Sequence, residues 1–313
     1  MFWRPLLLLT LPVSLLLAAC GTGGSVPAAG PDQVSIAASF YPLEYLTSRI
    51  AGDHAVVTTL TGPGVEPHEV ELSPRVVGSL SSTDLVVYAR GLQPAVDSAV
   101  DGQAADHQLD VNTAINLLRL EGDGTEETQA HEGDDGHDHG NVDPHFWLDP
   151  TLYQKVGASI ERELATLDPA HAADYEANLA DLSRDLTALD KDYVEGLASC
   201  ASRTLVTTHQ AFGYLAHRYD LHEISITGLA PDTEPSPGRL AEVTAQIRDQ
   251  GVTTVFTEPL LSDVVARTVA AETGTGVLIL DPVEGLTSSS AGTDYLQIMR
   301  ANLSSLREGL DCP

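Results

Sequence analysis

The sequence predicts an α/β protein of two lobes with parallel sheets, joined by one long helix. Two observations carry this prediction. Short β-rich runs alternate with helical segments in both halves of the 313-residue chain, a pattern typical of βαβ units. Between the halves lies a stretch of about seven helical turns without strand character.

The N-terminal lobe is expected to cover residues 34–167. Two of its predicted helices open with a proline, Pro42 or Pro74, which suits the first helical turn. Residues 121–142 are rich in glycine and acidic side chains and lack periodicity, so a mobile surface loop is expected there. The elements alternate strand and helix, starting with a strand, at 34–38, 42–50, 55–60, 74–80 and 84–89.

The linking helix is predicted at 168–198. Asp168 is a good N-cap, Pro169 suits the first helical position, and Gly196 is a plausible terminator. An apolar stripe at helical spacing predicts one packed face, formed by Leu179, Leu182, Leu186 and Leu189.

The C-terminal lobe is expected at 199–313, where the alternation of strand and helix returns. Its elements again start with a strand and alternate, at 203–208, 211–219, 223–227, 237–250, 252–257, 262–272, 277–280 and 293–308.

The first residues resemble a bacterial export signal. Arg4 precedes an apolar run at 6–17, so residues 1–19 are interpreted as a signal peptide. Cys20 follows two small residues, as in a lipobox, which predicts a lipid anchor at Cys20 and a flexible tether over 20–33. Ordinary signal cleavage beside Cys20 is the alternative. No later apolar run is long enough to span a bilayer, so the folded body is expected to be extracytoplasmic and lipid-anchored to the cell membrane.

The remaining cysteines, Cys200 and Cys312, form an even pair in an oxidising compartment, which predicts a disulfide. They cannot form a thiolate zinc site, so any bound metal must use histidine and carboxylate. A formal charge of −29 argues against nucleic acid as a partner and is compatible with attracting cations. A solvated acidic surface explains the same charge.

Four segments place a metal-capable residue in a loop or just beyond a predicted strand. These residues are His68, His145, His209 and Asp281. Open α/β sheets bind ligands at the carboxyl ends of their strands, and three imidazoles with one carboxylate suit zinc. Taken singly, each histidine also fits a solvated side chain, and Asp281-Pro282 also fits a turn. His131, His137 and His139 lie in the acidic loop, where weak auxiliary metal capture and plain solvated disorder are both open.

The order of motifs resembles the zinc and manganese solute-binding lipoproteins of ABC transporters over essentially the whole mature chain. The motifs are Ser39-Phe-Tyr-Pro-Leu43, Gly64-Val-Glu-Pro-His68-Glu69, Asp143-Pro-His-Phe-Trp-Leu-Asp-Pro150, His209-Gln-Ala-Phe-Gly-Tyr214, Phe256-Thr-Glu-Pro259 and Leu280-Asp-Pro282.

This resemblance implies a receptor that binds zinc in the cleft between the lobes, through His68, His145, His209 and Asp281, and delivers it to a membrane permease. Glu258 is implied as an outer partner of the site rather than a direct ligand. Manganese-selective relatives usually carry glutamate where this chain has His209, so zinc is favoured over manganese.

Other functions stay open as alternatives. Manganese or iron uptake would use the same fold, and an adhesin role would leave the metal site unaltered. A zinc hydrolase is disfavoured because Leu72 stands where a zincin helix beginning at His68-Glu69 would need histidine, and because four protein ligands leave no position for a reacting water. A monomer without enzymatic activity is expected.

Overall fold

The computed structural model describes residue 30 and residues 33–119, 142–231 and 233–313. Predictions for the signal peptide, for Cys20 with most of its tether, and for His131, His137 and His139 lie outside the described residues.

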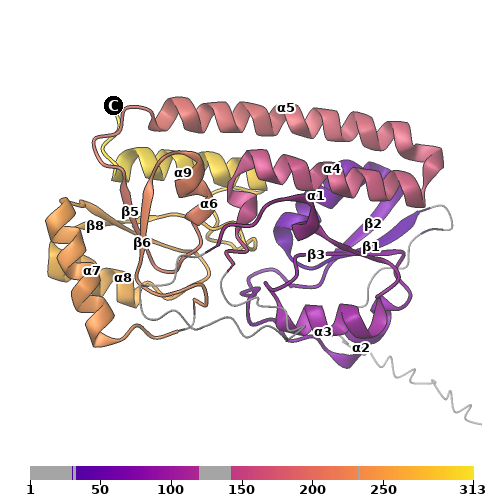
Figure 1. Ribbon diagram of the computed structural model, residues 1–313, viewed down its shortest axis with the longest axis horizontal. Coiled ribbons are helices and arrows are strands. Elements are labelled where there is room, and N and C mark those ends of the chain that lie inside the picture. The colour runs from indigo at the N-terminus through magenta and orange to yellow at the C-terminus, as the bar shows by residue number, and fades with distance from the viewer. Residues whose placement is uncertain (1–29, 31–32, 120–141, 232) are drawn as a thin grey trace, which may run out of the picture.

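Two α/β lobes lie side by side, each with a four-stranded parallel sheet (Figure 1). The N-terminal sheet has the strand order β2-β1-β3-β4 and the C-terminal sheet the equivalent order β6-β5-β7-β8. The predicted fold class is therefore confirmed. The strands are β1 Val34–Ala38, β2 Ala55–Thr59, β3 Leu85–Tyr88, β4 Gln108–Asp110, β5 Thr204–Thr207, β6 His222–Ser225, β7 Thr254–Thr257 and β8 Gly276–Ile279.

Helices pack on both sheets and join the lobes. Short 3-10 turns stand at η1 Gly52–His54, η2 Val111–Ala114, η3 Phe146–Leu148 and η4 Pro169–His171. The α-helices are α1 Tyr41–Ala51, α2 Pro74–Leu80, α3 Pro94–Gln103, α4 Pro150–Leu167, α5 Ala172–Leu197, α6 Gly213–Arg218, α7 Pro237–Gln250, α8 Val264–Thr273 and α9 Tyr295–Gly309.

Helix α5 extends along both lobes and packs on α4 over one lobe and on α9 over the other (Figure 1). Its apolar stripe is buried at Leu182, Leu186 and Leu189, as the sequence predicts. The helix begins later than Asp168, because the Asp168 carboxylate accepts hydrogen bonds from His171 Nδ1 at 2.6 Å and from the Tyr175 hydroxyl at 2.8 Å. These bonds hold the chain in the short turn η4 before α5 starts.

The main core continues from one lobe into the other through Trp147. The indole is fully buried and its ring centroid lies 4.8 Å from that of Phe40. Trp147 Nε1 donates to the carbonyl of Pro282 at 2.7 Å, and the Tyr295 hydroxyl donates to the carbonyl of Trp147 at 2.5 Å. Both partners belong to the C-terminal half, so the segment around Trp147 is tied to that half by buried hydrogen bonds.

Two further features bear on the predictions. A disulfide joins Cys200 to Cys312 and connects the end of α5 to the end of the chain. Within the described residues, none of the helices has the length and apolar character that a bilayer crossing requires.

Candidate metal centre

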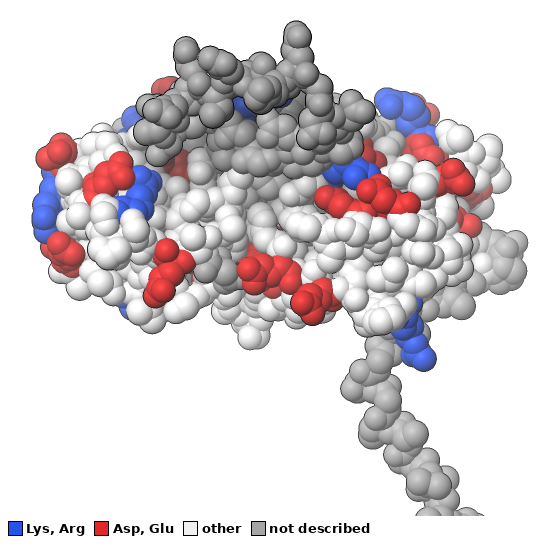
Figure 2. All heavy atoms as spheres, turned by 60° about the horizontal axis from the view of Figure 1, so that its bottom comes forward, with Lys and Arg blue, Asp and Glu red and all other residues white. Residues whose placement is uncertain are grey.

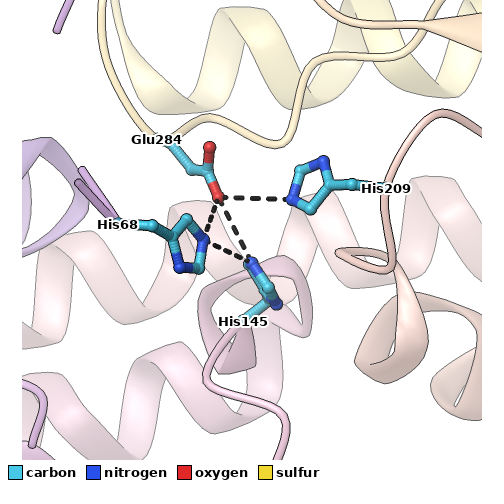
Figure 3. Close-up of side chains that lie close together, drawn as sticks. All are labelled: His68, His145, His209 and Glu284. Carbon is cyan, nitrogen blue, oxygen red and sulfur yellow. Dashed lines mark hydrogen bonds and ion pairs between the residues drawn. The ribbon is translucent and has the colours of Figure 1, made fainter. Parts of the chain in front are cut away.

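Four side chains from distant segments converge at one point between the lobes (Figure 3). They are His68 after β2, His145 before η3, His209 after β5 and Glu284 after β8. Each residue offers one possible ligand atom, and these four atoms all lie within 4.8 Å of one another. In the part of the chain that the structure describes, no other group of three or more His, Cys, Asp or Glu residues comes together in this way.

The donor atoms lie close enough together to face one common metal ion. His68 Nε2 lies 3.2 Å from His145 Nε2, and Glu284 Oε1 lies 3.3 Å and 3.2 Å from these two atoms. His209 Nε2 lies 3.7 Å from the same oxygen. Ligand bonds of 2.0–2.1 Å at tetrahedral angles place donors about 3.3 Å apart. Three of these four distances match that spacing, and His209 lies somewhat further from the Glu284 oxygen.

The loop that carries His68 is held by the N-terminal lobe. Gln93 Nε2, in a buried side chain, donates to Thr61 Oγ1 at 2.8 Å and to the carbonyl of Pro67 at 3.2 Å. The amide of His68 donates to Glu66 Oε1 at 3.1 Å. With a side chain 12% exposed, His68 is the most exposed of the four.

His145 is fully buried and its ring is oriented by Asp143. Asp143 Oδ1 accepts from the amide of His145 at 2.9 Å and lies 2.8 Å from its Nδ1. A proton on Nδ1 leaves Nε2 free to bind a metal, and such outer partners fix ring orientation in metal sites. Asp143 opens the Asp143-Pro-His motif, and no role was predicted for it. Its carboxylate, two residues before His145, was the available signal.

His209 is also fully buried, with Glu258 behind it. His209 Nδ1 lies 2.6 Å from Glu258 Oε2, and the Thr208 hydroxyl donates to Glu258 Oε1. Glu258 is absent from the converging group. This geometry agrees with the outer role that the sequence resemblance implies for Glu258.

The structure brings Glu284, not Asp281, into the group, which corrects the predicted carboxylate. Asp281 Oδ1 accepts from the amide of Val283 at 2.8 Å, and Val283 then adopts a positive φ of 60°. This turn redirects the chain, so the side chain three residues after Asp281 reaches the histidines. The turn reading of Asp281-Pro282 was the signal that could have identified Glu284.

Within the group, the carboxylates and the imidazoles stabilise each other's charged forms and so shift each other's pKa values. Burial alone would lower the pKa of His145, but hydrogen bonds with Asp143 and Glu284 outweigh it and raise that pKa to about 9. Against the same effect of burial, Glu258 and Glu284 raise the pKa of His209. Burial would raise the pKa of Glu284, but hydrogen bonds with the three histidines hold it well below its usual value. Nearby, burial raises the pKa of Asp281 to about 6.

The donor set suits a borderline divalent cation. Imidazole is preferred by zinc, copper and nickel, whereas manganese favours oxygen ligands. Three imidazoles and one carboxylate form a closed set of four protein ligands, which is typical of sites that hold a metal rather than activate water on it.

Comparison with known proteins gives one family. The family model described as "Zinc-uptake complex component A periplasmic" matches residues 36–309. The chain is 34% identical over 308 residues to the zinc-binding lipoprotein AdcA of Streptococcus pneumoniae. The matched region covers 97% of this chain but only 60% of AdcA. The chain is also 34% identical to the high-affinity zinc uptake system protein ZnuA of Bacillus subtilis, covering 95% of this chain and 94% of that protein.

Solved structures share the two-lobe fold. The Zn(II)-bound ZnuA-like domain of Streptococcus pneumoniae AdcA superposes with a TM-score of 0.73 at 32% identity, covering 89% of this chain and 99% of that domain. The laminin-binding protein Lmb of Streptococcus agalactiae, described as bifunctional with adhesin and metal transporting activity, gives a TM-score of 0.76 at 29% identity over 88% of this chain and 99% of Lmb. The chain therefore belongs to the family of the zinc-uptake complex component A.

Proposed function

We propose that this chain is an extracytoplasmic receptor that binds Zn²⁺ and delivers it to an ABC-type membrane permease. The observation that carries the proposal is the convergence of three imidazole nitrogens and one carboxylate oxygen within 4.8 Å of one another. His68, His145, His209 and Glu284 are the proposed ligands. The names of AdcA and ZnuA and the zinc-bound AdcA domain support zinc as the ion.

Binding in this site is an exchange of protons for metal. Glu284 keeps its negative charge in the metal-free chain because the imidazoles stabilise it. When zinc enters, any proton on Nε2 of His145 and His209 must leave, while Asp143 and Glu258 stay on the Nδ1 side of these two rings. The pocket thus offers zinc a negative charge and oriented rings.

The same geometry favours transport over catalysis. Four protein ligands leave no coordination position for a reacting water, and the ligands are almost completely buried. We therefore propose that the chain has no hydrolase activity and that zinc leaves only when the ligand segments separate. His68 lies on the N-terminal loop and is the most exposed ligand, so its departure is the simplest first step.

The cellular setting belongs to the same proposal. A signal peptide over 1–19 and a lipid anchor at Cys20 would place the monomeric receptor outside the membrane, beside its permease. The lipoprotein named among the relatives supports this arrangement. Binding of the receptor to laminin stays a separate prediction, which the similarity to Lmb favours.

Metal competition tests the proposed function. Purified metal-free chain, offered zinc and manganese together, is expected to take up one zinc per chain and exclude manganese. Bacteria lacking the chain should grow poorly in zinc-depleted medium and recover with added zinc. A preference for manganese, or growth restored by manganese alone, would overturn the choice of zinc.

A further inference from the structure

The start of helix α6 is fitted to Asp143, the residue that orients ligand His145. The Tyr214 hydroxyl donates to the carbonyl of Asp143 at 2.9 Å and accepts from the amide of Leu118 at 2.8 Å. Tyr214 is 2% exposed, and burial raises the pKa of its phenol, so the hydroxyl keeps its proton. Asp143 belongs to the segment that precedes α4, whereas Tyr214 belongs to the C-terminal half.

Gly213 is adapted to the same carboxylate. A Cβ atom at position 213 would lie 2.4 Å from Asp143 Oδ2, so any side chain there would displace Asp143. Two consecutive residues of α6 therefore serve Asp143, one by leaving space and one by a hydrogen bond. The helix also packs against η3, which follows His145 directly.

The backbone of Asp143 is held at both of its polar groups. Its amide donates to the carbonyl of Leu118 at 3.0 Å, and its carbonyl accepts from Tyr214. With both groups fixed, the carboxylate has one direction, in which Oδ1 reaches the amide and Nδ1 of His145. The ring of His145 is thus set by a chain of contacts that begins on the opposite lobe.

Resting on the proposed zinc-binding function, we propose that Tyr214 is a positioning residue of the metal site. Its hydroxyl fixes Asp143, and Asp143 in turn presents His145 Nε2 to the metal. His209 lies only five residues before Tyr214, so the same stretch between β5 and α6 carries both of them. This stretch therefore supplies the ligand His209 and also aligns the ligand His145. The distance between His145 and His209 is thereby set through α6.

The test compares Tyr214→Phe with Tyr193→Phe. Tyr193 is an equally buried tyrosine whose hydroxyl donates to the carbonyl of Met299 at 2.6 Å, between α5 and α9 and without any contact to the proposed ligands. Each variant loses one buried phenol-to-carbonyl hydrogen bond, and Tyr214→Phe also loses the acceptor of the Leu118 amide. Zinc affinity is measured by competition with a chromophoric chelator, and ligand geometry by the visible absorption spectrum of the Co²⁺-loaded chain.

Tyr214→Phe is expected to bind zinc about 10- to 100-fold more weakly, the range typical for loss of an outer partner, and to show an altered Co²⁺ spectrum. Tyr193→Phe should keep both the wild-type affinity and the wild-type spectrum. Wild-type affinity and spectrum in Tyr214→Phe, or equal losses in both variants, would overturn the positioning role.

A metal-free readout separates this proposal from the function on which it rests. The Nδ1-bound proton of His145, followed by nitrogen-15 NMR of the metal-free chain, should shift in Tyr214→Phe and not in Tyr193→Phe. A wild-type chain that bound no zinc would contradict the proposed function, while the NMR comparison would still decide the role of Tyr214.

Discussion

Glu284 and Asp281 stand three residues apart, and both are buried carboxylates. Only Glu284 reaches the histidines, since Asp281 Oδ1 is engaged by the amide of Val283. The difference between ligand and neighbour is therefore one of backbone direction, set at Val283.

Glu284→Gln and Asp281→Asn form a matched pair of substitutions. Glu284→Gln removes the proposed anionic ligand, so zinc affinity should fall by more than about 100-fold, beyond the usual effect of an outer partner. Asp281→Asn keeps an oxygen for the Val283 amide and should change affinity by less than about tenfold. Competition titrations of both variants measure this contrast. The reverse order would return the ligand role to Asp281.

Zinc binding should depend on pH up to about pH 9. His145 has a pKa of about 9 in the metal-free chain, so at pH 7 zinc must displace its proton. As the pH falls below 9, the zinc affinity should decrease by about tenfold per pH unit for each displaced proton. Titration calorimetry in buffers of different ionisation enthalpy should detect at least one proton released per zinc. Affinity that stays flat from pH 6 to pH 9 is the contrary result.

The raised pKa of His145 also affects the stability of the metal-free chain. Zinc affinity should increase toward alkaline pH, whereas the stability of the metal-free chain should decrease. The folded-state pKa of His145 is raised above its unfolded value near 6.5, so its contribution is fully present below pH 6.5. That contribution is lost as the pH rises through 9. Thermal melting of the metal-free chain should show a falling Tm over this window, and a rising Tm would contradict the raised pKa.

At the level of single elements, α6 shows how closely a short helix can be matched to a site. Gly213→Ala should destabilise the chain by about 1–3 kcal/mol, because the new methyl group collides with Asp143. It should also weaken zinc binding. Gly78→Ala in α2 is the control: nothing lies within 4 Å of its Cβ position, so it should be neutral or slightly stabilising. Denaturant unfolding compares the two, and equal stabilities would be evidence against the steric fit.

The elements that sequence could predict were those with strong local signals. The leucine stripe of α5 and the proline starts of α1 and α2 are examples. Helix α4 is missing from the prediction, although Val156, Ile160 and Leu164 form a buried stripe at helical spacing that could have identified it. Strand β4, of three residues, owes its existence to pairing with β3, a non-local contact that no local pattern reports.

The sequence predicted the three imidazoles of the converging group but not its carboxylate. The three histidines stand in sequence motifs beyond or between regular elements, where a ligand is easily recognised. Glu284 depends on a turn at positive φ, and Asp143 depends on a hydrogen bond that forms only when distant segments meet. The Asp281-Pro282 turn and the carboxylate two residues before His145 are local signals, but the contacts that give Glu284 and Asp143 their places are non-local.

At the scale of the molecule, α5 (Figure 1) and the shared core at Trp147 join the lobes. The disulfide lies within the C-terminal lobe, where it ties the end of α5 to the end of the chain. Acidic side chains spread over the face shown in Figure 2, with basic ones between them. The strong net charge is therefore not gathered into a single acidic site on that face, and the ligands themselves are buried.

Removing the disulfide should change stability without changing the site. Replacing both Cys200 and Cys312 by serine is expected to lower the free energy of unfolding by about 2–4 kcal/mol, because a loop of more than a hundred residues is no longer closed. Zinc affinity should match the wild type, since neither cysteine belongs to the converging group. A large loss of affinity in the folded variant would contradict the independence of the site from this bond.

Trp147 offers a probe of metal binding in the whole molecule. In a chain produced without residues 1–19, and so without Trp3, Trp147 is the single tryptophan. Its ring centroid lies 5.3 Å from that of His145. Zinc should change its emission at one equivalent, and Co²⁺ should quench it, whereas a site distant from Trp147 would leave the fluorescence unaltered.

The central claim is that one zinc ion lies between the lobes on four named side chains. A crystal structure of the zinc-loaded chain, with anomalous differences recorded at the zinc edge, tests it most directly. The account predicts one zinc bound by Nε2 of His68, His145 and His209 and by the Glu284 carboxylate, at ligand distances of about 2.0–2.2 Å. Zinc held by Asp281 in place of Glu284, or an ion at another position, would contradict it.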